Sequence, residues 1–134
     1  MLDIDKALEY KLKTTPEIAT LVGDRIYALR FPATPTLPCV VYTELDAPTD
    51  PVHGGTSNTV YTTSNYQIDA WAASFSVSVA LAKAIFDALE GFGGAVIKDG
   101  DVFTIQNILR STRRKNNDPE TSLFWISQDF TISY

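Results

Sequence analysis

Apolar and polar residues alternate with a period of two from residue 60 to residue 71. Because successive side chains of a strand point to opposite faces of its sheet, this alternation predicts a strand with one buried face. The apolar side carries Val60, Tyr66, Ile68 and Ala70, and the other side carries Tyr61, Thr63, Asn65, Gln67, Asp69 and Trp71.

The period becomes that of a helix directly after Ser74. Leu81, Ile85 and Leu89 recur at spacings of four residues, which places them on one helix face. Ser74 suits the N-cap, because its hydroxyl can accept a hydrogen bond from a free N–H of the first turn. Gly91 follows where a left-handed residue ends many helices. A long strand that feeds directly into a long helix is therefore the predicted centre of the fold.

Shorter patterns complete the chain. They predict helices at residues 3–13 and 16–22, strands at 25–29, 39–45, 102–111 and 122–134, a short hairpin around residues 98–101 and a long loop at 47–58. Three prolines predict an extended connection at 31–38. The expected structure is one α+β domain over residues 1–134, in the order α-α-β-β-β-α-β-β. It has an antiparallel or mixed sheet of about five strands, flanked by one long helix and by short N-terminal helices.

The composition is that of an ordinary folded domain. Of the 134 residues, 45% are hydrophobic and 20% are charged, as in globular proteins. The first six residues carry charges where a secretory signal needs an apolar run, and no window approaches the roughly 18 apolar residues of a membrane span. We expect synthesis in the cytoplasm and no membrane. The lone Cys39 cannot form an internal disulfide, which suits a reducing compartment.

Basic residues are unevenly distributed along the chain. None occurs from residue 31 to residue 82, whereas Arg110, Arg113, Arg114 and Lys115 supply four of the 11 within six positions. The net charge of −5 disfavours a protein whose whole surface binds phosphates. The basic cluster is either a solvated turn between the last two strands, or a docking surface for an acidic partner, a neighbouring copy or nucleic acid.

Groups suited to catalysis are scarce. His53 is the one histidine and lies in a glycine-rich loop, where exposure to solvent is expected. One histidine and one cysteine cannot supply the three or four ligands of a zinc site. Cys39 begins an apolar strand, so we expect a buried, unreactive thiol. Glu44 and Asp46 are expected on the outward face of one strand, which disfavours a carboxylate site. We expect no catalytic residue, no cofactor, no metal and no enzymatic activity.

Both tryptophans fall on the side of their strands away from the predicted core. Trp71 shares its side with Asp69, and the alternation around Phe130 sends Leu123 and Trp125 to the side opposite the core. Each indole brings about 150 to 250 Å² of ring surface that needs cover. Three explanations stay open: the N-terminal helices cover this face, a bulge reverses the register, or the aromatics form an interface between subunits.

Three sequence runs occur in a fixed order ahead of an alanine-rich helix. They are LVGDRIY at 21–27, LPCVVY at 37–42 and YQIDAWA at 66–72. Their order and spacing resemble the tail completion, or tail terminator, proteins of long-tailed bacteriophages over most of the chain. The resemblance implies an α+β protomer that forms a ring, usually hexameric, on the last ring of the tail tube. Such a ring stops tube growth and presents a surface to the head–tail connector protein.

The resemblance also implies partners and a location. The partners are further copies of the chain, the tail tube protein and the connector protein, with DNA passing through the lumen and no membrane. The location is the tail of the virion, after assembly in the host bacterial cytoplasm. No catalytic residue or cofactor defines the family. Two alternatives remain: a subunit of a phage-derived contractile or secretion apparatus, and a small ligand-binding α+β domain with a deep polar pocket.

The candidate interface combines the aromatic side of the sheet, the basic cluster and the loop histidine. A ring needs one patch of each copy to meet a different patch of the next, and segregated acidic and basic stretches supply such a pair. The candidate residues are Asp69, Trp71, Leu123, Trp125, Arg110, Arg113, Arg114, Lys115 and His53.

Overall fold

The computed structural model describes residues 2–47 and 62–134, which form three helices and seven strands. In chain order these are α1 (Ile4–Thr14), α2 (Pro16–Val22), β1 (Ile26–Ala28), β2 (Cys39–Asp46), β3 (Thr63–Ala72), α3 (Phe75–Leu89), β4 (Gly94–Lys98), β5 (Asp101–Ile105), β6 (Asn107–Asp118) and β7 (Leu123–Ser133). The predicted α+β class and element order are confirmed, with β4 and β5 as the predicted hairpin. Of the loop predicted at 47–58, the structure describes position 47 alone, so His53 lies outside the described residues.

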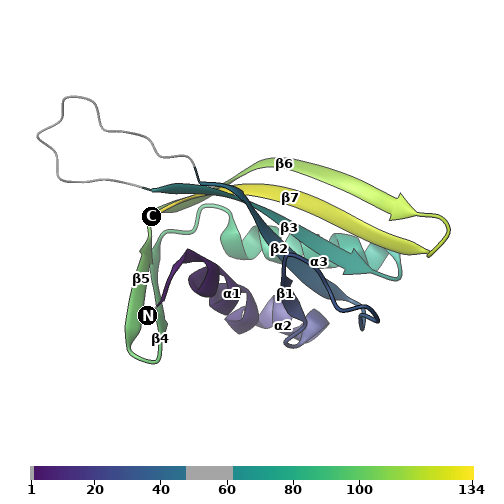
Figure 1. Cartoon of the computed structure of the whole chain (residues 1–134), viewed down its shortest axis with the longest axis horizontal. Coiled ribbons are helices and arrows are strands. Elements are labelled where there is room, and N and C mark those ends of the chain that lie inside the picture. Colours follow the sequence, from purple (N-terminus) through teal and green to yellow (C-terminus); the bar gives the residue numbers. More distant parts are fainter. Residues whose placement is uncertain (1, 48–61) are drawn as a thin grey trace, which may run out of the picture.

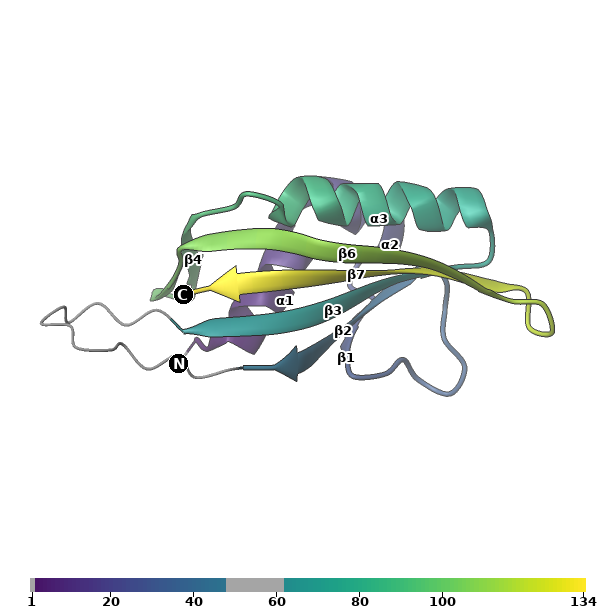
Figure 2. The same ribbon diagram turned by 90° about the horizontal axis from the view of Figure 1, so that it is seen from above.

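Five strands form the main sheet, in the order β1-β2-β3-β7-β6, and β4 pairs with β5 in a separate two-stranded sheet. The main sheet is mixed, because β1 runs parallel to β2 while the other pairs are antiparallel. All three helices lie against one face of this sheet (Figure 1). Seen from above, the opposite face carries none of the described helices, and β6 and β7 extend beyond the other strands at one end (Figure 2). The helical side therefore holds the core.

The core forms where the two predicted periodicities meet. Leu81, Ile85 and Leu89 of α3 are fully buried, as the helical spacing predicts. They belong to one hydrophobic cluster with Ile68 of β3 and Phe130 of β7. α1 and α2 extend this cluster through buried leucine, isoleucine and valine side chains. One long helix and two short N-terminal helices thus flank the sheet, as predicted, with α3 the longest at 15 residues.

Two of the three helices have a side-chain N-cap, including the one predicted at Ser74. The Asp3 carboxylate accepts a hydrogen bond of 2.9 Å from the N–H three residues on, and the Ser74 hydroxyl accepts one of 3.3 Å from the Val77 N–H. Thr15 makes no side-chain cap for α2. Its hydroxyl donates instead to the carbonyl of Lys11, at 2.7 Å, because α2 follows α1 without a connecting loop and that carbonyl lies within reach.

Replacing Ser74 with alanine is expected to lower the free energy of unfolding by about 1 kcal/mol, because α3 loses its side-chain cap. Urea denaturation measures this loss. Ser76→Ala is the matched control, since Ser76 is exposed on the same helix and caps nothing. Equal stability of the two variants would show that the cap contributes nothing.

The basic cluster lies on a strand, and its placement on a turn was wrong. β6 continues to Asp118, so the four basic residues are part of the edge strand of the main sheet. The strand predicted at 102–111 is divided at Gln106, where β5 leaves its partner β4 and β6 begins to pair with β7. A bulge at Ser111 then shifts the register, so that Arg110 pairs with Phe130 and Thr112 pairs with Asp129.

A second bulge separates two acidic residues that were expected on one face. Glu44 of β2 pairs with Tyr66, whereas Asp46 pairs with Asn65, the neighbouring residue of β3. The extra residue, Leu45, reverses the alternation at this point. Glu44 therefore lies on the helical side of the sheet and Asp46 lies on the uncovered side.

Candidate assembly interface

Three aromatic side chains form a cluster on the uncovered face, here called the aromatic patch (Phe31, Trp71 and Trp125). Trp71 and Trp125 are direct partners across β3 and β7. Their rings are stacked, with centroids 4.3 Å apart and planes at 15°. Phe31, from the segment between β1 and β2, meets Trp71 edge-on at 4.9 Å. All three side chains are half-buried, and neither indole belongs to the core cluster, as the alternation predicts.

The indoles are neither covered by the N-terminal helices nor turned into the core by a bulge. The N-terminal helices lie on the opposite face of the sheet (Figure 1). The bulges occur in β2 and β6, whereas the register between β3 and β7 is continuous from end to end. The proline-rich segment covers part of the patch through Phe31, a contact that the sequence did not indicate.

The indole N–H of Trp71 is buried and has no hydrogen-bond acceptor among the described residues. A buried tryptophan N–H ordinarily has a partner, and leaving a buried donor unsatisfied costs about 1 to 3 kcal/mol. Beside Trp71 lies a small pocket of about 150 Å³, lined in part by Leu29, Phe31 and Asp69. An acceptor supplied from outside the chain would remove this cost.

A polar network borders the aromatic patch on the same face. The Arg114 guanidinium donates two hydrogen bonds of 3.1 Å to the two carboxylate oxygens of Asp129. It also donates to the Gln67 side-chain oxygen at 3.3 Å. The Gln67 amide in turn donates to Asp69 at 3.0 Å. Residues from β3, β6 and β7 are thus connected across the face, although an exposed ion pair of this kind adds only about 0 to 1 kcal/mol.

Asp69 is the most buried charged group of this network, with 8% of its surface exposed. Burial raises the pKa of its carboxyl, and this effect exceeds the opposing hydrogen bonds from Ser127 and Gln67 and the positive charge of Arg114. The folded protein therefore retains the Asp69 proton to higher pH than an exposed aspartate would, and the charged form is held at a cost in stability.

Asp69→Asn is expected to raise the free energy of unfolding at neutral pH and to flatten its pH dependence. A carboxyl whose pKa is raised by folding binds its proton more tightly in the folded chain, so its contribution to stability is lost as pH rises from the usual aspartate range through the raised pKa. Urea titrations over a series of pH values measure the difference. Asp87→Asn, at an exposed position of α3, is the control. Parallel curves for wild type and Asp69→Asn would contradict this expectation.

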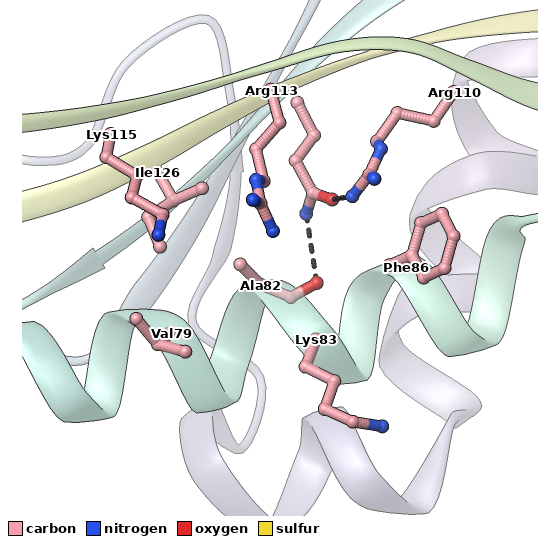
Figure 3. Close-up of a pocket in the computed structure, with 9 residues that line it drawn as sticks. Val79, Ala82, Lys83, Phe86, Arg110, Arg113, Lys115 and Ile126 are labelled. Carbon is pink, nitrogen blue, oxygen red and sulfur yellow. Dashed lines mark hydrogen bonds between the residues drawn. The ribbon is translucent and has the colours of Figure 1, made fainter.

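The bulge at Ser111 turns three of the four clustered basic residues toward α3. Arg110, Arg113 and Lys115 line a pocket of about 240 Å³ between β6 and α3, here called the basic groove. Figure 3 shows the three side chains above the helix, with Val79 and Phe86 below them. Only Arg114 points to the uncovered face. An unbroken alternation would have placed Arg110 and Arg114 on the same side.

The basic side chains of the groove differ in their contacts. Arg110 packs over the Phe86 ring at 4.1 Å and donates to the Gln128 side chain at 2.9 Å. Gln128 is fully buried and donates to the Ala82 carbonyl of α3 at 2.9 Å (Figure 3). Arg113 is exposed and has no hydrogen-bond or ion-pair partner within residues 2–47 and 62–134. Within the groove, the Arg110 side chain is therefore held by contacts with its own chain, whereas the Arg113 guanidinium is available to bind another molecule.

An acidic pocket lies at the other edge of the sheet. The Tyr66 hydroxyl donates to Asp5 of α1 and, at 3.0 Å, to Oε2 of Glu44. Burial and these two carboxylates raise the pKa of Tyr66, so the hydroxyl remains protonated. Asp5 and Glu44 line a pocket of about 280 Å³ together with Leu29. We call it the acidic pocket. The sequence pattern did not indicate this pocket, because Asp5 and Tyr66 are 61 positions apart.

The nine predicted interface residues thus divide between two surfaces. Five lie on the uncovered face, three line the basic groove, and His53 lies outside the described residues. The first five are Asp69, Trp71, Arg114, Leu123 and Trp125, and the next three are Arg110, Arg113 and Lys115.

Cys39 is fully buried, and burial raises the pKa of its thiol to about 11, so it remains a neutral thiol at physiological pH. Across residues 2–47 and 62–134, no three side chains of histidine, cysteine, aspartate or glutamate are grouped closely enough to hold a metal ion. None of the described helices has the length and hydropathy needed to span a bilayer.

The described residues form a two-layer α+β fold with one sheet face open and charged sites at both edges of the sheet. The chain belongs to the tail completion protein gp17 family, whose sequence model matches residues 6–134. It is therefore a structural protein of a phage tail. No curated protein sequence matches it significantly.

Among solved structures, the fold is similar to that of a chain in the virion of a native gene transfer agent (GTA) particle. The two chains superpose with a TM-score of 0.67 and share 16% sequence identity, over 97% of this chain and 92% of the other. At this identity the likeness shows a shared fold.

Proposed function

We propose that this protein forms a ring at the end of the tail tube, stops tube growth and joins the tail to the head–tail connector protein. The observation that carries the proposal is the stacked pair Trp71 and Trp125, on a sheet face that none of the described helices covers, with an indole N–H that no described residue satisfies. In a member of the tail completion family, such a face is suited to contact with another virion subunit. The 134 residues act as a single domain.

The aromatic patch is assigned to the contact with the tail tube protein. Partly exposed aromatic rings with a polar rim are typical of association surfaces, and here Arg114, Asp129 and Gln67 form that rim. The tube protein would supply an acceptor for the Trp71 N–H and cover the rings. The protein then acts through binding alone, without a catalytic centre or cofactor.

A ligand-binding role has weaker support. The pockets lined by the basic cluster, by Asp5 and Glu44 and by Trp71 have volumes of about 240, 280 and 150 Å³. Pockets for small molecules typically measure about 300 to 1,000 Å³ and bring several polar groups together.

Growth of tail tubes from purified tube protein, with and without this protein, tests the proposal. Tubes that grow alone are expected to vary in length, whereas tubes grown with this protein stop at lengths set by the time of its addition. Electron microscopy gives the length distribution. Continued growth in its presence would contradict the proposed function.

A further inference from the structure

Two charged sites lie at opposite edges of the main sheet. The basic groove borders β6 at one edge, and the acidic pocket borders β1 and β2 at the other. Both open on the helical side, because Arg113 lies over α3 and Glu44 faces Asp5 of α1. Copies placed side by side in the same orientation would therefore bring the basic groove of one copy to the acidic pocket of the next.

The acidic pocket is short of positive charge. Asp5 and Glu44 share a single neutral donor, the Tyr66 hydroxyl, and neither forms an ion pair with a basic side chain in the part of the chain that the structure describes. Two carboxylates close together repel each other, and a cation between them relieves that repulsion. The pocket thus favours an arginine or lysine head group with an apolar stem, which its Leu29 wall can cover.

The basic groove has the opposite imbalance. Arg113 has no hydrogen-bond or ion-pair partner among the described residues. Lys115 has no such partner there either, and its ammonium lies over the Phe75 ring, 5.7 Å from the ring centroid. Phe75 and Val79 beside the groove are exposed to 46% and 38%, and Leu29 beside the acidic pocket is exposed to 72%. Each site therefore offers unpaired charge next to uncovered apolar surface. The two are complementary in both respects.

We propose that the basic groove of one copy binds the acidic pocket of the next, with Arg113 placed between Asp5 and Glu44. The contact joins two different patches, and such a contact builds a ring where the rotation from one copy to the next closes on itself, as the proposed function requires. This inference rests on the ring of the proposed function and names the surfaces through which its copies meet. It leaves the uncovered face, with the aromatic patch, available for the tube protein.

Charge reversal tests the contact. Arg113→Glu and Glu44→Lys are each expected to weaken assembly of the ring about a hundredfold, because like charges then face each other. The double variant, carrying both changes in one chain, is expected to recover part of the assembly, since the introduced lysine and glutamate attract each other across the contact while the unchanged Asp5 still repels the glutamate. Native mass spectrometry and analytical ultracentrifugation, at high protein concentration and on tube ends, count the copies in each complex.

Matched controls separate this contact from changes in net charge. Lys98→Glu alters the charge of the chain by the same amount as Arg113→Glu but lies in the β4–β5 hairpin. Glu17→Lys matches Glu44→Lys and lies exposed on α2. Both controls are expected to assemble as the wild type does, and thermal unfolding verifies that all variants are folded.

The outcomes distinguish this inference from the proposed function. A wild type that stays monomeric in solution and on tube ends would overturn both. A wild-type ring that tolerates both single reversals would overturn the inference alone. Loss of tube capping in Arg113→Glu with an intact ring would assign the groove to the tube protein, and loss of DNA binding with an intact ring would assign it to nucleic acid. Either result would overturn the copy-to-copy contact.

Discussion

Trp71→Ala is expected to weaken binding to the tube end by at least about tenfold, while the chain stays folded. A tryptophan at the centre of an interface commonly contributes about 2 kcal/mol or more to binding. Here the indole is half-buried and lies outside the core cluster, so its removal creates no cavity in the core. The change also removes the unsatisfied N–H. Sedimentation of the variant with tubes measures the affinity.

Two further variants sharpen this result. Trp71→Phe keeps a stacking ring but cannot donate a hydrogen bond, so it is expected to bind with intermediate affinity. Phe103→Ala is the control, because Phe103 is a half-buried aromatic residue of β5 whose ring contacts Tyr134 at 5.3 Å, away from the patch. It is expected to bind tubes normally. Normal tube binding by Trp71→Ala would show that the aromatic patch does not contact the tube protein.

Phe130→Ala is expected to lower the free energy of unfolding by about 3 to 5 kcal/mol, the range for deletion of a buried aromatic ring. Phe130 is fully buried and belongs to the core between β7 and the helices. Because small domains are stable by only about 5 to 15 kcal/mol, this single change removes a large share of the total. Chemical denaturation measures it.

Leu109→Ala is the matched control on the neighbouring strand. Leu109 is exposed to 52%, and its replacement is expected to change stability by no more than about 0.5 kcal/mol. A loss below about 1 kcal/mol for Phe130→Ala would mean that the core lies elsewhere than between the sheet and α3.

The core and the direction of the indoles followed from local periodicity. β3 and β7 alternate without interruption, so the buried Phe130 and the outward Trp71 could each be assigned from the sequence. The helical spacing after Ser74 located α3, since one face of a helix repeats in a fixed way. Where pairing is regular, the side on which a residue lies depends only on its position within its own strand.

The basic groove and the acidic pocket could not be predicted in the same way. Ser111 and Leu45 are bulge residues, and a bulge depends on how two strands pair, which one strand's own alternation does not reveal. β6 carries many charged side chains, as edge strands often do. Because a run of charged residues is also typical of a solvated turn, the sequence pattern of the basic cluster favoured a turn. The acidic pocket joins α1 to β2 and β3, and Phe31 reaches Trp71 from a connection without regular structure.

Electron microscopy of a tube end bound by the wild-type protein, at a resolution that separates protomers, would show whether the protein closes the tube through these surfaces. We expect one closed ring at the tube end, with Trp71 and Trp125 against the tube protein and the β6 edge of each copy beside β1 and β2 of the next. Copies scattered along the tube wall, or a tube end without the protein, would contradict it.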